Sequence, residues 1–221
     1  MKRIICGFVL ILVVVPAMFF VSQAVGTLQT LTRVERERDT WQRPDEILRH
    51  LQLAPGNTVV DLGSGAGYFS LKIAPRVAAN GRVFAVDLRR QSLAFLWIRA
   101  VLNGDSNLHV VRGEVDDPKL PPGPVDAVLI ANTYHELTTP EPILKALFTA
   151  MRSGARLVVV DRGPREGGER RPLPAAHHEM RPADAERAIT QQGFQSVARD
   201  DRFIDRLADD DVWWLIVLRK P

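Results

Sequence analysis

The strongest chemical signal in this sequence is a glycine-rich turn that follows a strand-like segment. The stretch VVDLGSGAGYFSLKIA, residues 59–74, reads as a strand, a tight turn and the first turns of a helix. Glycines at 63, 65 and 67 let the backbone approach a ligand closely, as nucleotide cofactor sites require. The pattern predicts a binding loop for a cofactor that contains a nucleoside, with a purely structural turn as the alternative.

The glycine spacing and two nearby carboxylates indicate which cofactor the loop would hold. Dinucleotide loops read G-x-G-x-x-G, whereas this loop reads G-x-G-x-G. Asp61 lies just before the loop, where its charge would repel a pyrophosphate but suit the ammonium and sulfonium groups of S-adenosylmethionine. Asp87 ends the strand-like segment 82–87, RVFAVD, where an acid accepts hydrogen bonds from ribose hydroxyls; a helix N-cap is the alternative role. A P-loop is excluded because no Gly-Lys-Ser/Thr follows.

A second group of reactive side chains follows the fourth strand-like segment. Tyr134, His135 and Glu136 come shortly after residues 125–131, at the edge where doubly wound folds bind ligands. Methyl transfer needs a base only when the acceptor must lose a proton, as a phenol or hydroxyl does. We identify His135 as the candidate base and Glu136 as the side chain that would orient it. The alternative is a loop histidine that caps the following helix near Thr139.

The remaining candidates for metal or thiol chemistry are few. His177, His178 and Glu179 are adjacent, so their side chains point in different directions and lack a third spaced ligand; we expect no metal site there. Cys6 is the single cysteine, which excludes an intrachain disulfide and a cysteine-built zinc site. The long loop at residues 163–176 is a candidate lid over the substrate.

These residues require a scaffold of alternating strands and helices. Strands are expected at residues 58–62, 82–87, 108–111, 125–131 and 156–160, and helices at 68–79, 91–102, 141–151 and 182–192. Such alternation specifies a parallel, doubly wound α/β sheet with helices on both faces. The late strands 195–198 and 212–218 have no long helix between them and should form an antiparallel hairpin, with Trp213 and Trp214 as packing residues.

The N-terminus has a different composition from the rest. Lys2 and Arg3 precede the nearly uncharged apolar run 4–21, and about 20 such residues cross the hydrocarbon core of a bilayer. We expect residues 1–25 to be a membrane anchor or, because Ser22-Gln23-Ala24 resembles a cleavage site, a signal removed near Ala24. The arginines after the segment favour a cytoplasmic catalytic domain, and Lys2 and Arg3 favour the opposite topology.

The rest of the chain is expected to comprise a helical lead-in, residues 26–54, and one domain, residues 55–221. The breaker pair Pro55-Gly56 separates them. The net charge is only +3, with acidic and basic residues interleaved. This charge pattern is typical of a solvated surface, so no nucleic-acid partner is expected.

From about residue 41 to 218, the sequence resembles the class I S-adenosylmethionine-dependent methyltransferases. VVDLGSGAGYFS resembles the family's first motif and VFAVDL its second. The resemblance implies a seven-stranded Rossmann-like sheet with an antiparallel last strand, and residues 55–221 as a domain that binds S-adenosylmethionine. The cofactor-binding residues that it implies in these two motifs are Asp61, Gly63, Ser64, Gly65, Gly67, Tyr68, Asp87 and Leu88.

Three further segments extend this resemblance. VVRGEVDDPKLP is similar to the segment that borders the adenine, which places Glu114 near its amino group or ring edge. VDAVLIANTYHEL resembles the fourth-strand motif, in which the region of Asn132 faces the methyl donor, and MRSGARLVVVD resembles the segment that leads into the fifth strand. Amino-methylating relatives often carry Asn/Asp-Pro-Pro-Tyr where this chain has Asn-Thr-Tyr-His, so amide and exocyclic-amine acceptors are disfavoured.

The expected acceptor is therefore a small, apolar molecule such as a quinone, phenol or lipid near a membrane. Two other functions stay open at this stage. One is methylation of RNA or protein, against which the absence of a basic block argues. The other is a module that binds the nucleoside without catalysis.

Overall fold

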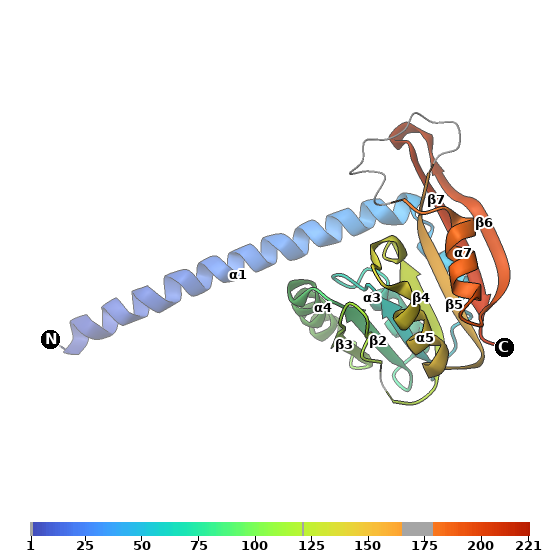
Figure 1. Ribbon diagram of the computed structural model, residues 1–221. Helices are drawn as coiled ribbons and strands as arrows, with labels where there is room; N and C mark the ends of the chain where they lie inside the picture. Colours follow the sequence, from blue (N-terminus) through green and yellow to red (C-terminus); the bar gives the residue numbers. More distant parts are fainter. Residues whose placement is uncertain (1, 121, 165–178) are drawn as a thin grey trace. The chain divides into compact units, whose positions relative to one another are not determined.

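The protein is described by a computed structural model over residues 2–120, 122–164 and 179–221; for residues 2–17, 19–21 and 208 only the backbone is described. The chain divides into two compact units, Met1–Trp41 and Gln42–Pro221. The structure thus places the division after Trp41, whereas the sequence suggested boundaries at residues 25 and 54. Figure 1 shows the elements in chain order.

The first unit is a single helix, α1 (Lys2–Trp41). Its backbone is helical across residue 25, so the expected anchor and the first part of the expected lead-in, residues 26–41, lie on one helix. A search of the part of the chain with described side chains finds no helix long and apolar enough to span a bilayer. Most of the apolar run 4–21, on which the anchor prediction rests, lies outside those residues.

The second unit begins at a tight bend. Arg43 adopts a left-handed conformation with φ of 55°, directly before the proline that opens α2 (Pro44–His50). A residue before proline is disfavoured in the right-handed helical region, which explains why helix does not run through this position. The Arg43 side chain holds the bend against β6 (Gln195–Arg206), because its guanidinium stacks over the Phe203 ring, 4.3 Å from the ring centroid.

The core of this unit is a seven-stranded sheet in the order β3-β2-β1-β4-β5-β7-β6. Strands β1 to β5 are parallel, and β7 is antiparallel to both β5 and β6. This confirms the predicted parallel sheet and antiparallel last strand. The strands are β1 (Thr58–Leu62), β2 (Arg82–Asp87), β3 (Leu108–Arg112), β4 (Val125–Ala131), β5 (Met151–Gly163), β6 (Gln195–Arg206) and β7 (Asp211–Arg219).

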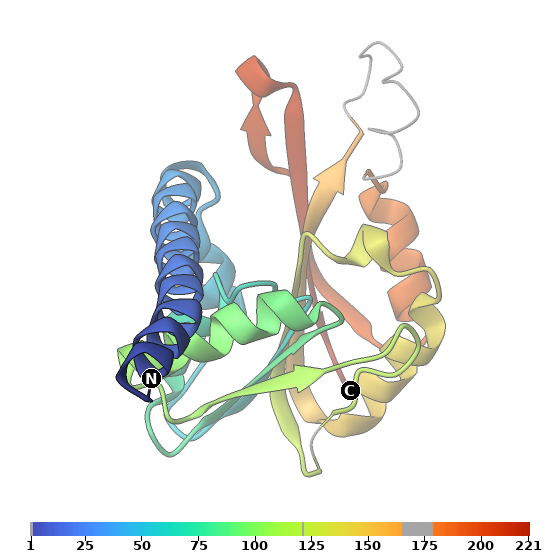
Figure 2. The same cartoon turned by 90° about the vertical axis from the view of Figure 1, so that its left-hand side faces the viewer.

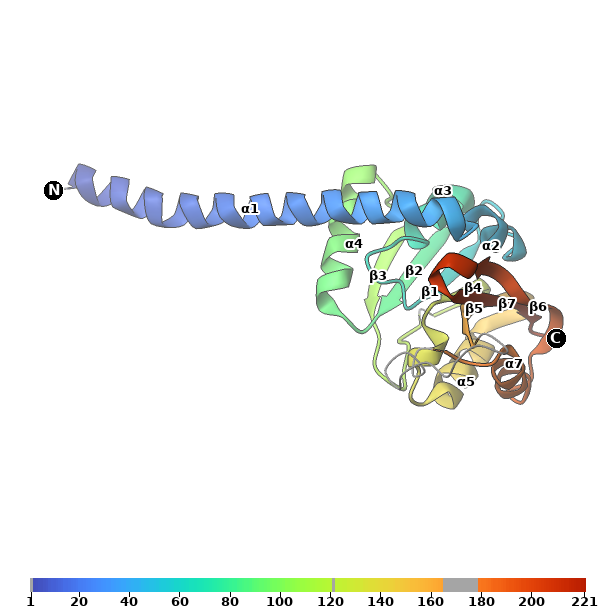
Figure 3. The same cartoon turned by 90° about the horizontal axis from the view of Figure 1, so that it is seen from above.

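Helices cover both faces of the sheet. Figures 2 and 3 show α3 (Ser70–Val77) and α4 (Arg90–Asn103) on one face, and α5 (Pro140–Ala150) and α7 (Pro182–Thr190) on the other. Two 3₁₀ turns, η1 (Tyr134–Glu136) and η2 (Leu207–Asp209), complete the elements named for this unit. Proline at the first position of α5 and of α7 suits a helix start, because its missing N–H would have no intrahelical acceptor there.

Two strands extend by more than two residues beyond the ranges that their sequence pattern predicted. β5 extends beyond 156–160 because Asp161, Arg162 and Gly163 pair with β7. β6 extends beyond 195–198 through the charged run 199–202, which is exposed. Charged residues on an edge strand prevent pairing with other chains. Because such residues show no alternation of apolar and polar positions, the sequence pattern does not identify this part of the strand. Trp213 and Trp214 are 1% and 0% exposed, as predicted for packing residues.

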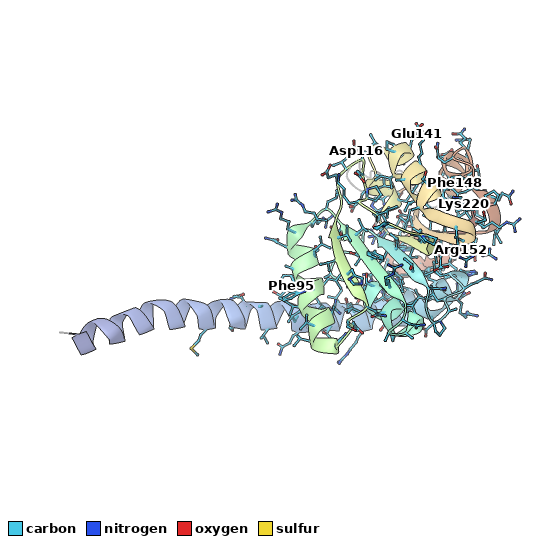
Figure 4. The ribbon with its side chains drawn as sticks, turned by 90° about the horizontal axis from the view of Figure 1, so that it is seen from below. Phe95, Asp116, Glu141, Phe148, Arg152 and Lys220 are labelled. Carbon is cyan, nitrogen blue, oxygen red and sulfur yellow. The ribbon has the colours of Figure 1, made fainter. Side chains whose placement is uncertain are left out.

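The edge of the sheet where the parallel strands begin is closed by structural contacts. Asp126 accepts hydrogen bonds from the Thr58 amide at 2.7 Å and from the Arg152 guanidinium at 2.5 Å. The Lys220 ammonium donates to the Met151 carbonyl at 2.7 Å and lies over the Phe148 ring. Figure 4 shows Phe148, Arg152 and Lys220 close together at this end. The side chains predicted to do chemistry belong to the opposite, carboxyl edge.

Candidate active site

The glycine-rich loop leaves β1 at the carboxyl edge and stays close to β2. The amides of Gly63 and Ser64 both donate to the Val86 carbonyl, at 2.8 and 3.0 Å. The Gly67 amide then donates to the Ser64 carbonyl at 2.9 Å, which turns the chain into α3. The backbone of this loop therefore follows the end of the neighbouring strand.

The glycines of this loop are required for different physical reasons. A Cβ atom at Gly63 would lie 2.1 Å from Thr133 Oγ1, because the Thr133 side chain packs directly on the loop backbone. A Cβ at Gly67 would similarly overlap the Leu96 side chain of α4. Gly65 has a φ of 54°, and a Cβ there would meet no atom of the described residues within 4 Å. Gly65 is thus the point of the loop that a ligand can approach.

Asp87 connects the end of β2 to this loop. Its Oδ2 accepts a hydrogen bond from the Gly65 amide, and its Oδ1 accepts one from the Arg89 amide, both at 2.8 Å. The N-cap position of α4 is Arg89, which makes no side-chain cap, so Asp87 is not the helix N-cap. Each carboxylate oxygen has two lone pairs, which leaves capacity for ribose hydroxyls. Leu88 beside it is 50% exposed.

Asp61 is more enclosed than Asp87. Its carboxylate is 2% exposed and accepts a hydrogen bond from Ser70 Oγ at 2.5 Å. Ser70 is the first residue of α3, so the contact ties the end of β1 to the helix that follows the loop. Tyr68 is also buried, with its ring edge-on to Phe69 at 4.7 Å. Both residues are therefore buried at the ends of the loop, and the contact between Asp61 and Ser70 joins the segments on either side of it.

Glu114 lies on the loop after β3. The Gly113 amide donates to the Asp87 backbone carbonyl at 3.2 Å, so this loop starts beside the end of β2. The Glu114 carboxylate is exposed and lies 3.4 Å from the Lys119 ammonium. Lys119 also hydrogen-bonds Asp117, which lowers the pKa of the Asp117 carboxyl and raises that of Lys119. Glu114 is thus placed at the carboxyl edge in an accessible position.

The buried polar atoms at this edge that have no hydrogen-bond partner within the described ranges include Ser64 Oγ and Asn132 Oδ1. Asn132 has a φ of 54°, and its amide donates to the Val160 carbonyl at 2.8 Å. A buried polar group without a partner costs about 1–3 kcal/mol. Together with the open side of Gly65, these atoms fit a ligand that carries several hydrogen-bonding groups, as S-adenosylmethionine does.

His135 lies on η1 with its side chain 4% exposed. Its Nδ1 is 2.6 Å from Asp161 Oδ1, and its amide donates to Asp161 Oδ2 at 3.0 Å. Glu136, the orienting residue suggested by the sequence, forms an ion pair with Arg89 at 3.3 Å, and its Oε1 is 3.9 Å from His135 Nε2. The structure therefore places a different carboxylate, from the end of β5, against the ring.

The other roles considered for these residues differ from what the structure shows. The N-cap position of α5 is Thr139, and the Nδ1 atom of His135 lies against Asp161, so His135 is not the cap of that helix. Tyr134 is 1% exposed, and its hydroxyl has no hydrogen-bond partner among the described residues. Burial raises the pKa of this phenol to about 12.

Sequence reasoning missed Asp161 as a site residue. Asp161 entered the sequence analysis only as the last residue of the segment MRSGARLVVVD, and it is 26 positions from His135. The available signal was its type: a carboxylate at the end of an otherwise aliphatic strand. Such a residue lies at the carboxyl edge, where doubly wound folds bind ligands.

The structure gives little information on the candidate metal ligands and the candidate lid. His177, His178 and nearly all of the candidate lid at 163–176 lie outside the described residues. Within the part of the chain that is described, no cluster of three or more His, Cys, Asp or Glu side chains could hold a metal ion.

Comparison with known proteins yields one family and two kinds of relative. A family model described as "Methyltransferase domain" matches residues 53–202. The chain is 27% identical over 108 residues to the ubiquinone/menaquinone biosynthesis C-methyltransferase UbiE of Vibrio campbellii, an alignment that covers 48% of this chain and 42% of that protein. The chain thus spans less than half the length of this relative.

Solved structures share the fold. A SAM-dependent methyltransferase from Aquifex aeolicus has a TM-score of 0.70 at 21% identity, over 86% of this chain and 97% of that one. Phosphoethanolamine N-methyltransferase 2 of Haemonchus contortus, solved in complex with S-adenosylmethionine, has a TM-score of 0.69 at 14% identity, over 82% and 53% of the two chains.

Proposed function

Because this chain belongs to the methyltransferase-domain family, we propose that it binds S-adenosylmethionine and methylates a small, apolar acceptor. The observation that carries this proposal is the contact between Asp87 and Gly65, which holds the open point of the glycine loop beside a carboxylate suited to ribose. A carboxylate beside the open point of the loop suits a nucleoside that bears no phosphate better than it suits a pyrophosphate.

Each part of the cofactor has a candidate partner among the residues of the carboxyl edge. Asp87 would accept from the ribose hydroxyls, and Leu88 and Glu114 would lie near the adenine. Ser64 Oγ and Asn132 Oδ1 would receive partners that they lack within the described residues. Asp61 would contribute negative charge near the ammonium and sulfonium, from a buried position at the end of β1.

The chemistry needs little beyond positioning. S-adenosylmethionine supplies an electrophilic methyl carbon on a sulfonium, a good leaving group. Holding two reactants in a productive geometry contributes roughly 7 kcal/mol or more to lowering a barrier. The protein's further task is to accept the proton of an acceptor that must lose one, and His135 is the group at this edge that can do so.

The nature of the acceptor is inferred from two features. The apolar run at residues 4–21 would bring the domain to a membrane, where apolar acceptors accumulate. The curated relative UbiE is named for methylation in ubiquinone and menaquinone biosynthesis, and quinones are apolar. Both features favour a quinone, a phenol or a lipid over RNA or protein.

The test is transfer of a radiolabelled methyl group from S-adenosylmethionine into a cell lysate that is then separated into lipid, RNA and protein fractions. We expect label in the lipid fraction. Label in RNA or protein would contradict the proposed acceptor while preserving the reaction. Protein that binds S-adenosylhomocysteine in calorimetry but labels no fraction would be a binding module without catalysis.

A further inference from the structure

The carboxyl end of β5 carries a buried carboxylate that contacts two nitrogen atoms of one residue, His135. Asp161 is 0% exposed. Its Oδ2 accepts from the His135 amide at 3.0 Å, and its Oδ1 accepts from the Arg162 amide at 2.8 Å and lies 2.6 Å from His135 Nδ1. The same side chain therefore holds both the backbone and the ring of His135.

For an ionised Asp161 and a neutral ring, this geometry determines which ring nitrogen carries the proton. An ionised carboxylate can only accept hydrogen bonds, so a ring nitrogen at 2.6 Å from it must donate. A neutral imidazole has one N–H and one lone pair. With the proton on Nδ1, the lone pair is on Nε2.

From this arrangement we propose that Asp161 is the positioning residue for His135: it fixes the neutral ring in the Nδ1–H tautomer, so that Nε2 can take a proton from the methyl acceptor. This inference rests on the proposed function and adds to it a restriction on the acceptor, which must have an acidic O–H or C–H group.

The proton balance of the step is simple. As the acceptor atom bonds to the methyl carbon, the carbon–sulfur bond breaks and its electron pair stays on sulfur. The acceptor's proton passes to Nε2, which leaves the ring with an N–H at both nitrogens, and then to water. Asp161 stays ionised throughout and stabilises the imidazolium, as the aspartate does in a serine protease triad.

Neighbouring contacts place His135 close to the cofactor loop. Thr133, two residues earlier, packs against Gly63, and its hydroxyl is 3.5 Å from the Gly63 carbonyl. On the other side, Glu136 is drawn towards Arg89, which is two residues beyond Asp87. The ring is thus held between the ends of β4 and β5, on the segment that contacts the glycine loop.

A purely structural role for Asp161 is a distinct alternative. In that case the carboxylate would only satisfy the two backbone amides, and the tautomer of the ring would not depend on it. The two roles differ in a quantity that can be measured without any acceptor: the protonation pattern of the His135 imidazole.

The experiment is nuclear magnetic resonance of the full chain labelled with ¹⁵N in histidine, at a pH where the ring is neutral. The chain has five histidines, and the signal missing from a His135→Gln variant identifies His135. We expect the couplings of the Nδ1–H tautomer in the wild type. In Asp161→Asn, the amide can donate or accept, so we expect the Nε2–H tautomer to appear.

Asp211→Asn is the matched control. Asp211 is also a buried carboxylate that accepts from a ring N–H, that of Trp213 at 2.8 Å, but it does not touch His135. Its substitution should leave the His135 signal unchanged.

Two results would overturn the inference. One is an Nε2–H tautomer in the wild type, which decides the matter even if Asp161→Asn fails to fold. The other is an Asp161→Asn protein that is folded, binds S-adenosylhomocysteine and retains the wild-type tautomer. Failure to bind the cofactor or to transfer a methyl group would instead count against the proposed function and leave the tautomer result standing.

Discussion

The Gly65 amide donates a hydrogen bond of 2.8 Å to Asp87 Oδ2. The carboxylate expected to bind the ribose therefore also holds the glycine loop on which the rest of the cofactor would lie. A single side chain thus shapes the binding loop and is also the one that we expect to bind the ribose.

Asp87→Ala should weaken S-adenosylhomocysteine binding by roughly tenfold or more while the fold is retained. Charge-assisted hydrogen bonds contribute about 1.5–3 kcal/mol each, and the substitution also releases the loop. Isothermal calorimetry measures the affinity. Asp201→Ala is the control, because Asp201 is an exposed aspartate on β6, at the opposite edge of the sheet from β2 and β3. Unchanged affinity in Asp87→Ala would show that this carboxylate does not contact the ligand.

Gly63→Ala should lower the free energy of unfolding more than Gly104→Ala. Both glycines have a φ of 77°, but an added Cβ meets Thr133 at Gly63 and nothing within 4 Å among the described residues at Gly104. A left-handed alanine costs about 1–2 kcal/mol, and overpacking adds about 1–3 kcal/mol at Gly63. Urea denaturation measures both values, and equal losses would contradict the close packing of Thr133 on the loop.

Gly65→Ala should have a different effect from Gly63→Ala. Because its Cβ meets no atom of the described residues within 4 Å, the fold should lose only the cost of a left-handed alanine. The added methyl group would project into the space assigned to the cofactor. We therefore expect a marked loss of S-adenosylhomocysteine affinity with little loss of stability. The opposite pattern would place the ligand elsewhere.

Asp61→Asn should weaken S-adenosylmethionine more than adenosine, because the substitution keeps the shape and removes the charge near the cationic end of the cofactor. Adenosine lacks that end and serves as the internal control. Competition binding measures the affinity of the wild type and of the variant for both ligands. NADH should not displace either ligand from either protein. If the variant gained affinity for NADH and bound S-adenosylhomocysteine as before, the loop would be a dinucleotide site.

The stability of the protein should depend on Tyr134 at high pH. Burial raises the pKa of Tyr134 to about 12 from its usual value of 10.0, so the folded state keeps this proton where the unfolded state releases it. The contribution is fully present below pH 10 and is lost as the pH rises to about 12, a decrease of roughly 2–3 kcal/mol.

Ultraviolet absorbance of the phenolate can follow this titration directly. The chain has two tyrosines, so a Tyr68→Phe variant reports Tyr134 alone. We expect its ionisation to coincide with the loss of stability, and Tyr134→Phe to remove that part of the pH dependence. A Tyr134 phenol that titrates near 10 in folded protein would mean that it is accessible to water.

Residues 1–25 should direct the chain to a membrane, with the domain on the cytoplasmic side. The double substitution Leu12→Arg and Val14→Arg should abolish membrane targeting, because each arginine costs about 2.5–3.5 kcal/mol at the centre of a membrane helix. Fractionation of cells and a reporter fused after Pro221 measure location and topology. A reporter that is active only outside the cytoplasm would reverse the topology, and a mature N-terminus at Val25 would identify a cleaved signal.

The sequence alone was sufficient to predict the elements and the type of sheet. Aliphatic runs between breaker pairs such as Asn80-Gly81 located β1 to β4 within one residue of their observed ends, and the absence of a helix before β7 predicted the antiparallel pair. These features are local, because strand and helix periodicity and turn residues act over a few neighbouring positions. The charged half of β6 was missed since its exposed residues have no apolar periodicity.

Only the tertiary structure decided which side chains meet at the carboxyl edge. His135 and Asp161 are 26 positions apart, and they meet because β4 and β5 pair in parallel, with Ala131 opposite Val160. Glu136, adjacent in sequence to His135, turns instead towards Arg89 at the end of β2. Sequence proximity favoured Glu136 as the orienting residue, but strand order and register determine which carboxylate reaches the ring.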